Sequence, residues 1–188
     1  MRKFGVVIGF LVVSSLAVAQ PYYSANYSSQ NLGDFTSYMK LDYMHFTGSH
    51  ISSFDGPYLG VGVDWNCRLF KVAYGQLKPS LQLGTGRAYG DGSHLDFSNI
   101  ELNMRYIYPI GQNLFAGFGA GIGAADVKLQ GMSSGIVGTM QGSGELDVKI
   151  SPNIYIGAQA KYQFASEYKN TGINPDNYRL GIKLGMMF

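Results

Sequence analysis

This sequence has very little cysteine and no marked excess of basic charge. Cys67 is the single cysteine among 188 residues, so neither a disulfide within the chain nor a multi-cysteine metal site can form. The 14 Lys and Arg residues are nearly matched by 12 Asp and Glu residues, and no basic run occurs. A nucleic-acid partner is therefore not indicated.

Long apolar runs are also scarce. The longest, at 4–13, falls short of the roughly 18 consecutive apolar residues that indicate a transmembrane helix, and no segment has the spacing of a long amphipathic helix. Charged residues make up only 14% of the chain, whereas it holds 26 glycines, 14 tyrosines and 11 phenylalanines. This mixture is typical of many strands separated by turns.

The N-terminus predicts export. Arg2 and Lys3 precede the apolar run, and Ala17 and Ala19 supply the small-x-small pattern of a signal-peptidase site. We therefore expect a signal peptide at 1–19, a mature chain that starts at Gln20, and a periplasmic N-terminal segment at 20–34. The residue at the expected cleavage point is Gln20 and not a cysteine, which argues against a lipoprotein anchor.

From about residue 35, apolar and polar residues alternate with the period of two that strands show. The alternating segments are 38–43, 58–67, 73–87, 99–108, 114–123, 145–150, 154–163 and 178–188. Longer polar connections at 47–56, 88–94, 125–141 and 165–176 alternate with tight turns, as in transmembrane barrels. We therefore expect residues 35–188 to form an all-β, transmembrane up-and-down antiparallel β-barrel of about eight strands, with both termini on the periplasmic side. Pro79 would delete a ladder hydrogen bond, so we expect a bulge there.

The two faces of these segments favour lipid on the apolar side. The strands of a soluble sandwich or a lipocalin-like barrel also alternate apolar and polar residues. The period of two alone therefore does not distinguish these folds from a transmembrane barrel. However, the apolar faces persist for five or six alternate positions, and aromatic residues cluster near segment ends, as a bilayer and its interfaces require. The opposite faces carry both signs of charge interleaved with glycine. We expect these charges to pair inside a narrow lumen: Lys40, Asp42, Asp64, Glu101, Arg105, Glu145, Asp147, Lys149, Lys161, Arg179 and Lys183.

The last segment, 178–188, has alternating apolar residues and ends in Phe188. It resembles the small outer-membrane β-barrel superfamily that includes the OmpA membrane domain, OmpX and the opacity proteins. The resemblance implies a place in the outer membrane of a Gram-negative bacterium, in contact with its lipid and lipopolysaccharide. It also implies that the barrel-assembly machinery recognises Phe188 during biogenesis. It implies fold and location more firmly than activity.

Two motifs could suggest chemistry, and we expect neither to carry it. The alternate glycines of 117–123 lie in a strand, whereas a phosphate-binding loop needs a strand, a glycine turn and a helix. His94, Asp96 and Ser98 occupy alternate positions entering the fourth segment. Lipid A deacylases of the outer membrane resemble this architecture and use a strand-borne His and Ser, but with one residue between them rather than three. We therefore expect no catalytic, cofactor or metal site.

The expected width of the barrel also predicts its function. An eight-stranded barrel has an interior just wide enough for its own side chains, so we expect a non-enzymatic outer-membrane barrel. Its exposed loops, above all 125–141 and 165–176, would contact envelope or host partners. Two alternatives stay open: a narrow transport barrel for a small molecule or ion, and a lipid A-modifying outer-membrane enzyme.

Overall fold

The computed structural model of the protein describes residues 35–66, 75–169 and 171–188. The predicted signal peptide, the segment at 20–34 and Cys67 lie outside these residues. Within the part described, no helix is long and apolar enough to cross a membrane. The strands are β1 (Phe35–Phe46), β2 (Asp55–Trp65), β3 (Gln76–Gly90), β4 (Ser93–Pro109), β5 (Leu114–Leu129), β6 (Gly135–Ser151), β7 (Ile154–Ala165) and β8 (Asn177–Met187).

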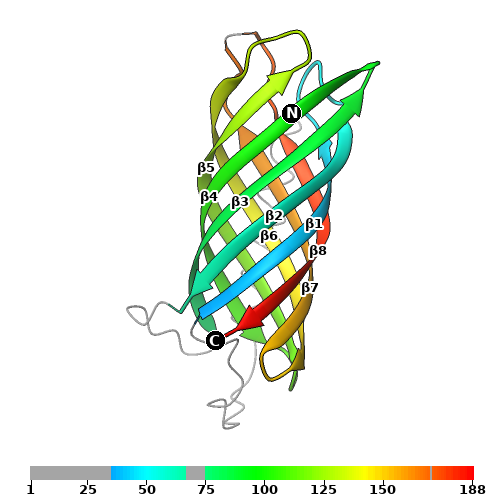
Figure 1. Cartoon of the computed structure of the whole chain (residues 1–188). Coiled ribbons are helices and arrows are strands. Elements are labelled where there is room, and N and C mark those ends of the chain that lie inside the picture. Colours follow the sequence, from blue (N-terminus) through cyan, green and yellow to red (C-terminus); the bar gives the residue numbers. More distant parts are fainter. Residues whose placement is uncertain (1–34, 67–74, 170) are drawn as a thin grey trace.

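The strands form a closed barrel in chain order (Figure 1). Each pairs antiparallel with the next, and β8 closes the sheet onto β1 with Ile182 opposite Leu41. Closure leaves no strand edge, so backbone donors and acceptors are satisfied within the barrel, as a bilayer demands. The predicted up-and-down β-barrel is confirmed.

The ends of the barrel differ. The end that holds the segments 47–54, 130–134 and 166–176 is the loop end, at the top of Figure 1. The other end, the turn end, holds the short turns 110–113 and 152–153. The start of β1 and the C-terminus also lie there, where Phe188 donates a backbone hydrogen bond to Phe35 over 2.9 Å.

Strand geometry places alternate side chains on opposite faces of the sheet. On β8, Ile182 is 58% exposed on the outside, whereas Lys183 is 2% exposed in the lumen. The strands that cross with about eleven residues at a tilt of about 45° span about 25 Å, the height of a lipid-facing apolar band. The outward apolar side chains over this height form what we call the belt: Met39, Leu41, Leu59, Val61, Leu83, Ile100, Leu102, Met104, Ile122, Leu146, Ile156, Leu180, Ile182 and Leu184.

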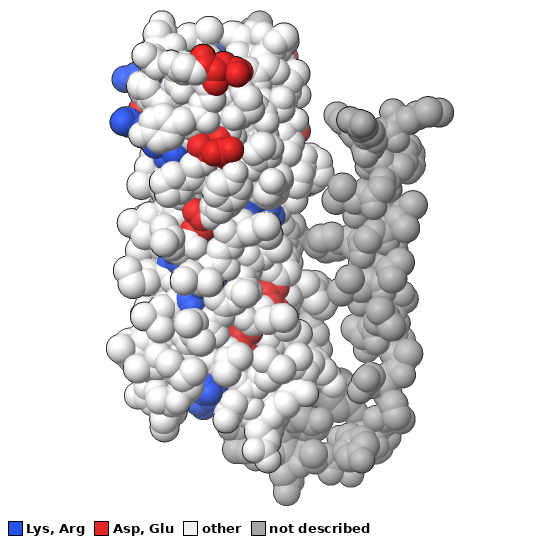
Figure 2. Space-filling view, turned by 90° about the vertical axis from the view of Figure 1, so that its right-hand side faces the viewer, with Lys and Arg blue, Asp and Glu red and all other residues white. Residues whose placement is uncertain are grey.

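An apolar outside and a charged inside are the reverse of a soluble barrel. Uncharged side chains cover most of the face in Figure 2, and its largest acidic patches lie toward the loop end. The polarity of the two faces therefore makes this a transmembrane barrel, with the belt as its lipid-facing surface.

Two of the predicted long connections are wrong. The stretch 88–94 is a tight hairpin in which Asp91 and Gly92 have φ angles of 50° and 73°. Most of 125–141 is strand, because β5 continues to Leu129 and β6 starts at Gly135. Polar residues such as Asp126 and Lys128 point outward, while Val127 points inward and is buried. The outward polarity marks strands that face water beyond the belt, not loops.

The predicted bulge at Pro79 is also wrong. Pro79 stays in register with Met104 of β4, and the ladder between β2 and β3 ends next to it, at the pair Asp64 and Ser80. The proline therefore lies at the end of a ladder, where a missing donor is tolerated. A register shift occurs instead in β6, between Lys149 and Ser151.

Candidate functional site: a lumen of paired charges

Two groups of buried charges occupy the middle of the lumen. The turn-side cluster consists of Asp64, Arg105, Glu145, Asp147 and Lys183. Arg105 Nη1 lies 2.6 Å from both carboxylate oxygens of Asp64, and its Nη2 lies 2.5 Å from Glu145 Oε1. Lys183 bridges Glu145 and Asp147, with 2.9 Å to Asp147 Oδ2. Such multidentate pairing offsets the cost of burying the charges.

The loop-side cluster consists of Lys40, Asp42, Glu101, Lys161 and Arg179. Glu101 is fully buried and accepts hydrogen bonds from both Lys161 and Arg179, the latter over 2.5 Å. Lys40 Nζ lies 3.0 Å from Asp42 Oδ2. The Arg179 guanidinium also stacks on a tyrosine ring, with its Cζ 4.5 Å from the centroid of Tyr58.

Four layers follow one another along the lumen, and β4 contributes to each of them. From the loop end, Phe97 belongs to an apolar plug, Glu101 to the loop-side cluster, Arg105 to the turn-side cluster and Ile107 to a second apolar plug. The loop plug contains Met44, Phe46, Ile51, Phe54, Tyr58, Ala88, Leu95, Phe97, Ala125, Val127, Val137 and Tyr168. The turn plug contains Tyr38, Ile107, Phe115, Tyr155 and Met187.

The clusters gather all the lumen charges expected from the sequence except Lys149, which is half-buried at the turn end. Sequence reasoning did not include Lys78, which is 1% exposed in the lumen. Its alternation with Ser80 and Gln82 in β3 was the available signal. The alternation does not reveal the loop plug either, because its inward residues on the long hairpins lie in stretches that the sequence predicts to be loops.

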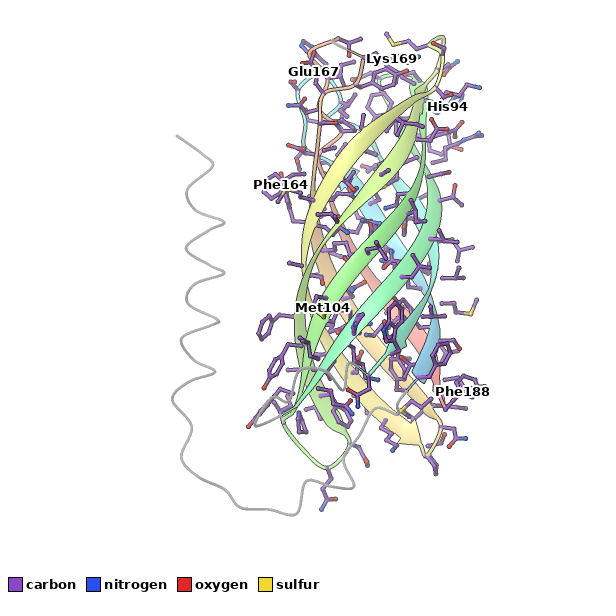
Figure 3. The ribbon with its side chains drawn as sticks, turned by 90° about the vertical axis from the view of Figure 1, so that its left-hand side faces the viewer. His94, Met104, Phe164, Glu167, Lys169 and Phe188 are labelled. Carbon is purple, nitrogen blue, oxygen red and sulfur yellow. The ribbon has the colours of Figure 1, made fainter. Side chains whose placement is uncertain are left out.

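Aromatic side chains lie at both ends of the belt. Near the turn end, the rings of Phe35 and Phe188 are 6.1 Å apart. Toward the loop end, the rings of Tyr162 and Phe164 are 4.7 Å apart, and Figure 3 shows Phe164 pointing away from the barrel. These positions suit the two interfaces of a bilayer, where aromatic girdles form.

Solved structures share this architecture, although no protein-family model matches the chain and no curated protein matches it in sequence. Neisserial surface protein A superposes with a TM-score of 0.69 at 11% identity, covering 83% of this chain and 98% of that one. This chain therefore has the fold of the small outer-membrane β-barrels. The N-terminal barrel domain of OprF from Pseudomonas aeruginosa has a TM-score of 0.52 at 13% identity, with 82% of this chain and 97% of that chain covered.

A third small outer-membrane barrel in this comparison, PagL, is an outer membrane enzyme. Its TM-score is 0.53 at 14% identity, and the match covers 79% of this chain and 99% of that chain. Likeness at this identity extends to the fold alone. Whether this chain has an active site therefore depends on its own side chains.

The outward residues His94, Asp96 and Ser98 are held by neighbours on β3 rather than by one another. Asp96 accepts hydrogen bonds from Arg87 over 2.5 and 3.2 Å, and the Ser98 hydroxyl lies 2.9 Å from that of Thr85. Ser98 lies four residue steps along the extended strand from His94, a distance of about 13 Å, whereas a base must lie within hydrogen-bond reach of its nucleophile. These three residues therefore do not form a catalytic group.

His45 and His50 lie near the loop end, and His50 has a φ angle of 67° in the first loop. The His45 ring lies 5.0 Å from that of Tyr178. Among the described residues, no group of three or more His, Cys, Asp or Glu side chains is arranged to hold a metal ion.

Proposed function

We propose that the protein is a non-enzymatic outer-membrane barrel whose loop-end surface binds an envelope or host partner. The observation that carries the proposal is the contrast between the two parts of the molecule. The lumen is filled by its own paired charges and plugs. The loop end, in contrast, exposes side chains that neither face lipid nor pair inside the lumen. A lumen filled by side chains has no room for a ligand, and binding residues lie disproportionately on loops carried by a rigid scaffold.

The loop-end surface is built as one unit. Lys169 Nζ donates to Ser133, with 2.6 Å to the hydroxyl and 3.0 Å to the carbonyl oxygen, which joins 166–176 to the tip of the β5–β6 hairpin. The Ser49 hydroxyl donates to the Gly172 carbonyl over 2.8 Å, which joins the first loop to the same segment. Figure 3 shows Glu167 and Lys169 together at this end. Loops tied to one another lose less conformational entropy on binding.

Exposed apolar side chains project from this surface. Ile136 is 82% exposed and Met132 is 44% exposed, both on the β5–β6 hairpin and beyond the belt. Exposed apolar residues rimmed by polar ones, here Lys169 and Glu167, are typical of a protein-interaction site.

The proposal is tested by shortening the loops on whole cells. The full chain would be expressed in a Gram-negative host beside variants in which 130–134 or 167–174 is replaced by a two-residue turn, with Ser98→Ala as a matched control. Adhesion to immobilised host extracellular proteins and to epithelial cells would be measured. We expect the shortened variants to lose adhesion while keeping the folded, heat-modifiable gel band.

Three outcomes would contradict the proposal. Adhesion that is equal in all variants would remove the loops as the binding surface. Single-channel conductance in planar bilayers would favour the transport barrel. Altered lipid A acylation in expressing cells, abolished by Ser98→Ala, would favour the lipid A-modifying enzyme.

A further inference from the structure

Closure removes strand edges at the height of the belt, but beyond the belt β6 has one. β6 begins at Gly135 and pairs with β5 from that residue on. Its ladder with β7 begins only at Thr139. One further backbone bond, from the Ser166 N–H to the Gly138 carbonyl, lies above that ladder. Over 135–137, β6 is therefore an edge strand.

The backbone groups of Ile136 point out of this edge. In an antiparallel ladder, alternate residues bond to the neighbours on opposite sides. Lys149 donates its N–H to Asn113 on the β5 side of β6, whereas Gly138 accepts from Ser166 on the β7 side. Odd-numbered residues of β6 thus face β5, and even-numbered residues face β7. The N–H and C=O of Ile136 therefore point away from β5, and they have no hydrogen-bond partner among the described residues.

The loop that follows β7 leaves this edge open. Tyr168 turns inward and is buried in the loop plug, and its backbone bonds within its own loop. Among the described residues after Ser166, only side chains reach the β5–β6 hairpin: the Tyr168 hydroxyl and the Lys169 ammonium both donate to Ser133. Ile136 is left 82% exposed.

The sequence of this edge does not protect it from pairing. Natural edge strands are usually blunted by proline, by charged side chains or by a covering loop. The residues at 134–138 are Ser-Gly-Ile-Val-Gly, without proline or charge. On the other side of the projecting hairpins, the first loop covers the end of β3: Gly90 lies against Phe54, and the Ser53 hydroxyl donates to Asp91 over 2.6 Å. In the described part of the projecting sheet, β6 is the open side.

We propose that this β6 edge binds an extended segment of a partner protein, which adds to the sheet as a further strand. The inference rests on the proposed function and names the way in which the loop end holds its partner. The segment takes the place that β7 would occupy if it continued beyond Ser166, and it exchanges both backbone hydrogen bonds with Ile136. On the outer face it meets the Ile136 side chain, so its opposing residue is β-branched or aromatic.

Hydrogen exchange tests the open edge without any variant. The isotopically labelled full chain would be refolded in detergent micelles, and the exchange of single amides would be followed by NMR. The N–H of Ile136 should exchange about 100-fold or more faster than that of Val137, which faces β5. Exchange at Ile136 that is as slow as at Val137 would overturn the proposal.

Ile136→Pro tests the pairing itself. The N–H of Ile136 takes no part in a ladder, so proline is tolerated there, and the heat-modifiable gel band checks the fold. The variant removes the donor and places the proline ring against the incoming segment. In the cell-adhesion assay above, adhesion should fall about tenfold or more. Ile136→Thr is the matched control: it keeps the donor and the strand preference, and its adhesion should stay within about threefold of the unaltered chain.

The outcomes separate this inference from the proposed function. If shortening 130–134 abolishes adhesion while Ile136→Pro keeps it, the edge is excluded and the loop-end surface stands. Equal losses in Ile136→Pro and Ile136→Thr would assign binding to the side chain and also overturn the added strand. Adhesion that no loop variant changes would overturn both. Clumping of expressing cells without host protein, abolished by Ile136→Pro, would make a second copy of this chain the occupant and would exclude the partner segment.

Discussion

Removing Glu101 should destabilise the barrel more than removing an acidic residue from a loop. Glu101 is fully buried and accepts hydrogen bonds from Lys161, Arg179 and the Asn99 amide, the last over 2.6 Å. Glu101→Ala would leave two buried cations without their carboxylate. Breaking a buried pair by deleting one partner costs about 3 to 5 kcal/mol. We expect a loss of that order for Glu101→Ala.

Glu167→Ala is the matched control, since Glu167 is exposed in the loop at 166–176. Its Oε1 accepts a hydrogen bond from the Gly172 backbone N–H over 2.5 Å, so its removal should cost no more than one exposed hydrogen bond, about 0.5 to 1.5 kcal/mol. Both variants would be measured by urea unfolding in lipid vesicles, with the fluorescence of Trp65, the single tryptophan, as the probe. The difference in midpoint at unchanged slope gives the difference in stability.

A double variant tests the reasoning further. Glu101→Gln with Lys161→Met replaces a buried ion pair by neutral side chains, and such replacements are often neutral or stabilising. The double variant should therefore be more stable than Glu101→Ala. Equal losses for Glu101→Ala and Glu167→Ala would refute the paired lumen, because only a wide, water-filled pore would screen the orphaned cations so well.

Three further predictions concern other parts of the chain. Ile182→Arg, on the belt, should cost about 2 to 4 kcal/mol in a lipid-refolding assay, whereas Tyr178→Arg near the loop-end interface should cost about 0 to 1 from the same term; similar values would argue against a bilayer gradient. Phe97→Ala in the loop plug should cost about 3 to 5 kcal/mol without creating conductance in planar bilayers, since the charge clusters still fill the lumen. Mass analysis of the outer-membrane fraction should find Gln20 as the first residue, and retention of Arg2 and Lys3 would rule out secretory processing.

The alternation of the sequence was sufficient to predict the barrel and the facing of its strands. In 178–188 the alternate apolar residues Leu180, Ile182, Leu184 and Met186 fall on the outside, because side-chain direction in a strand depends on position. Met187, one position out of phase with them, points inward and joins the turn plug. The same argument assigned Glu101 and Arg105 to the lumen before any contact was known. A closed sheet needs no further information, since neighbours in an up-and-down meander are neighbours in the chain.

The distance to which the hairpins extend beyond the belt could not be predicted from the alternation. Polar residues at Asp126 and Lys128 suggested a loop, but they are the water-facing side of strands that continue beyond the belt. Their inward partners, such as Val127 and Val137, form the loop plug with residues of the first loop. That packing is set by tertiary contacts, which period-two alternation does not encode.

Charge partners were likewise beyond the sequence. Arg105 pairs with Asp64 and Glu145, which are 41 and 40 positions away in the chain. These partners meet because the registers of several strands bring them to one height across the lumen. The face on which a side chain lies can be derived from its own strand. Its charge partner across the lumen depends on the stagger of all the strands in the barrel.

The lipid-facing belt is the central claim, and depth-dependent fluorescence quenching tests it most directly. Ile182→Cys and Glu167→Cys would each be made in a Cys67→Ser background, labelled with a small fluorophore and refolded into vesicles. We expect a nitroxide on the lipid tails to quench the label at position 182 strongly, and aqueous iodide to quench the label at position 167. A label at position 182 that iodide quenches and the lipid-tail nitroxide does not would contradict the transmembrane barrel.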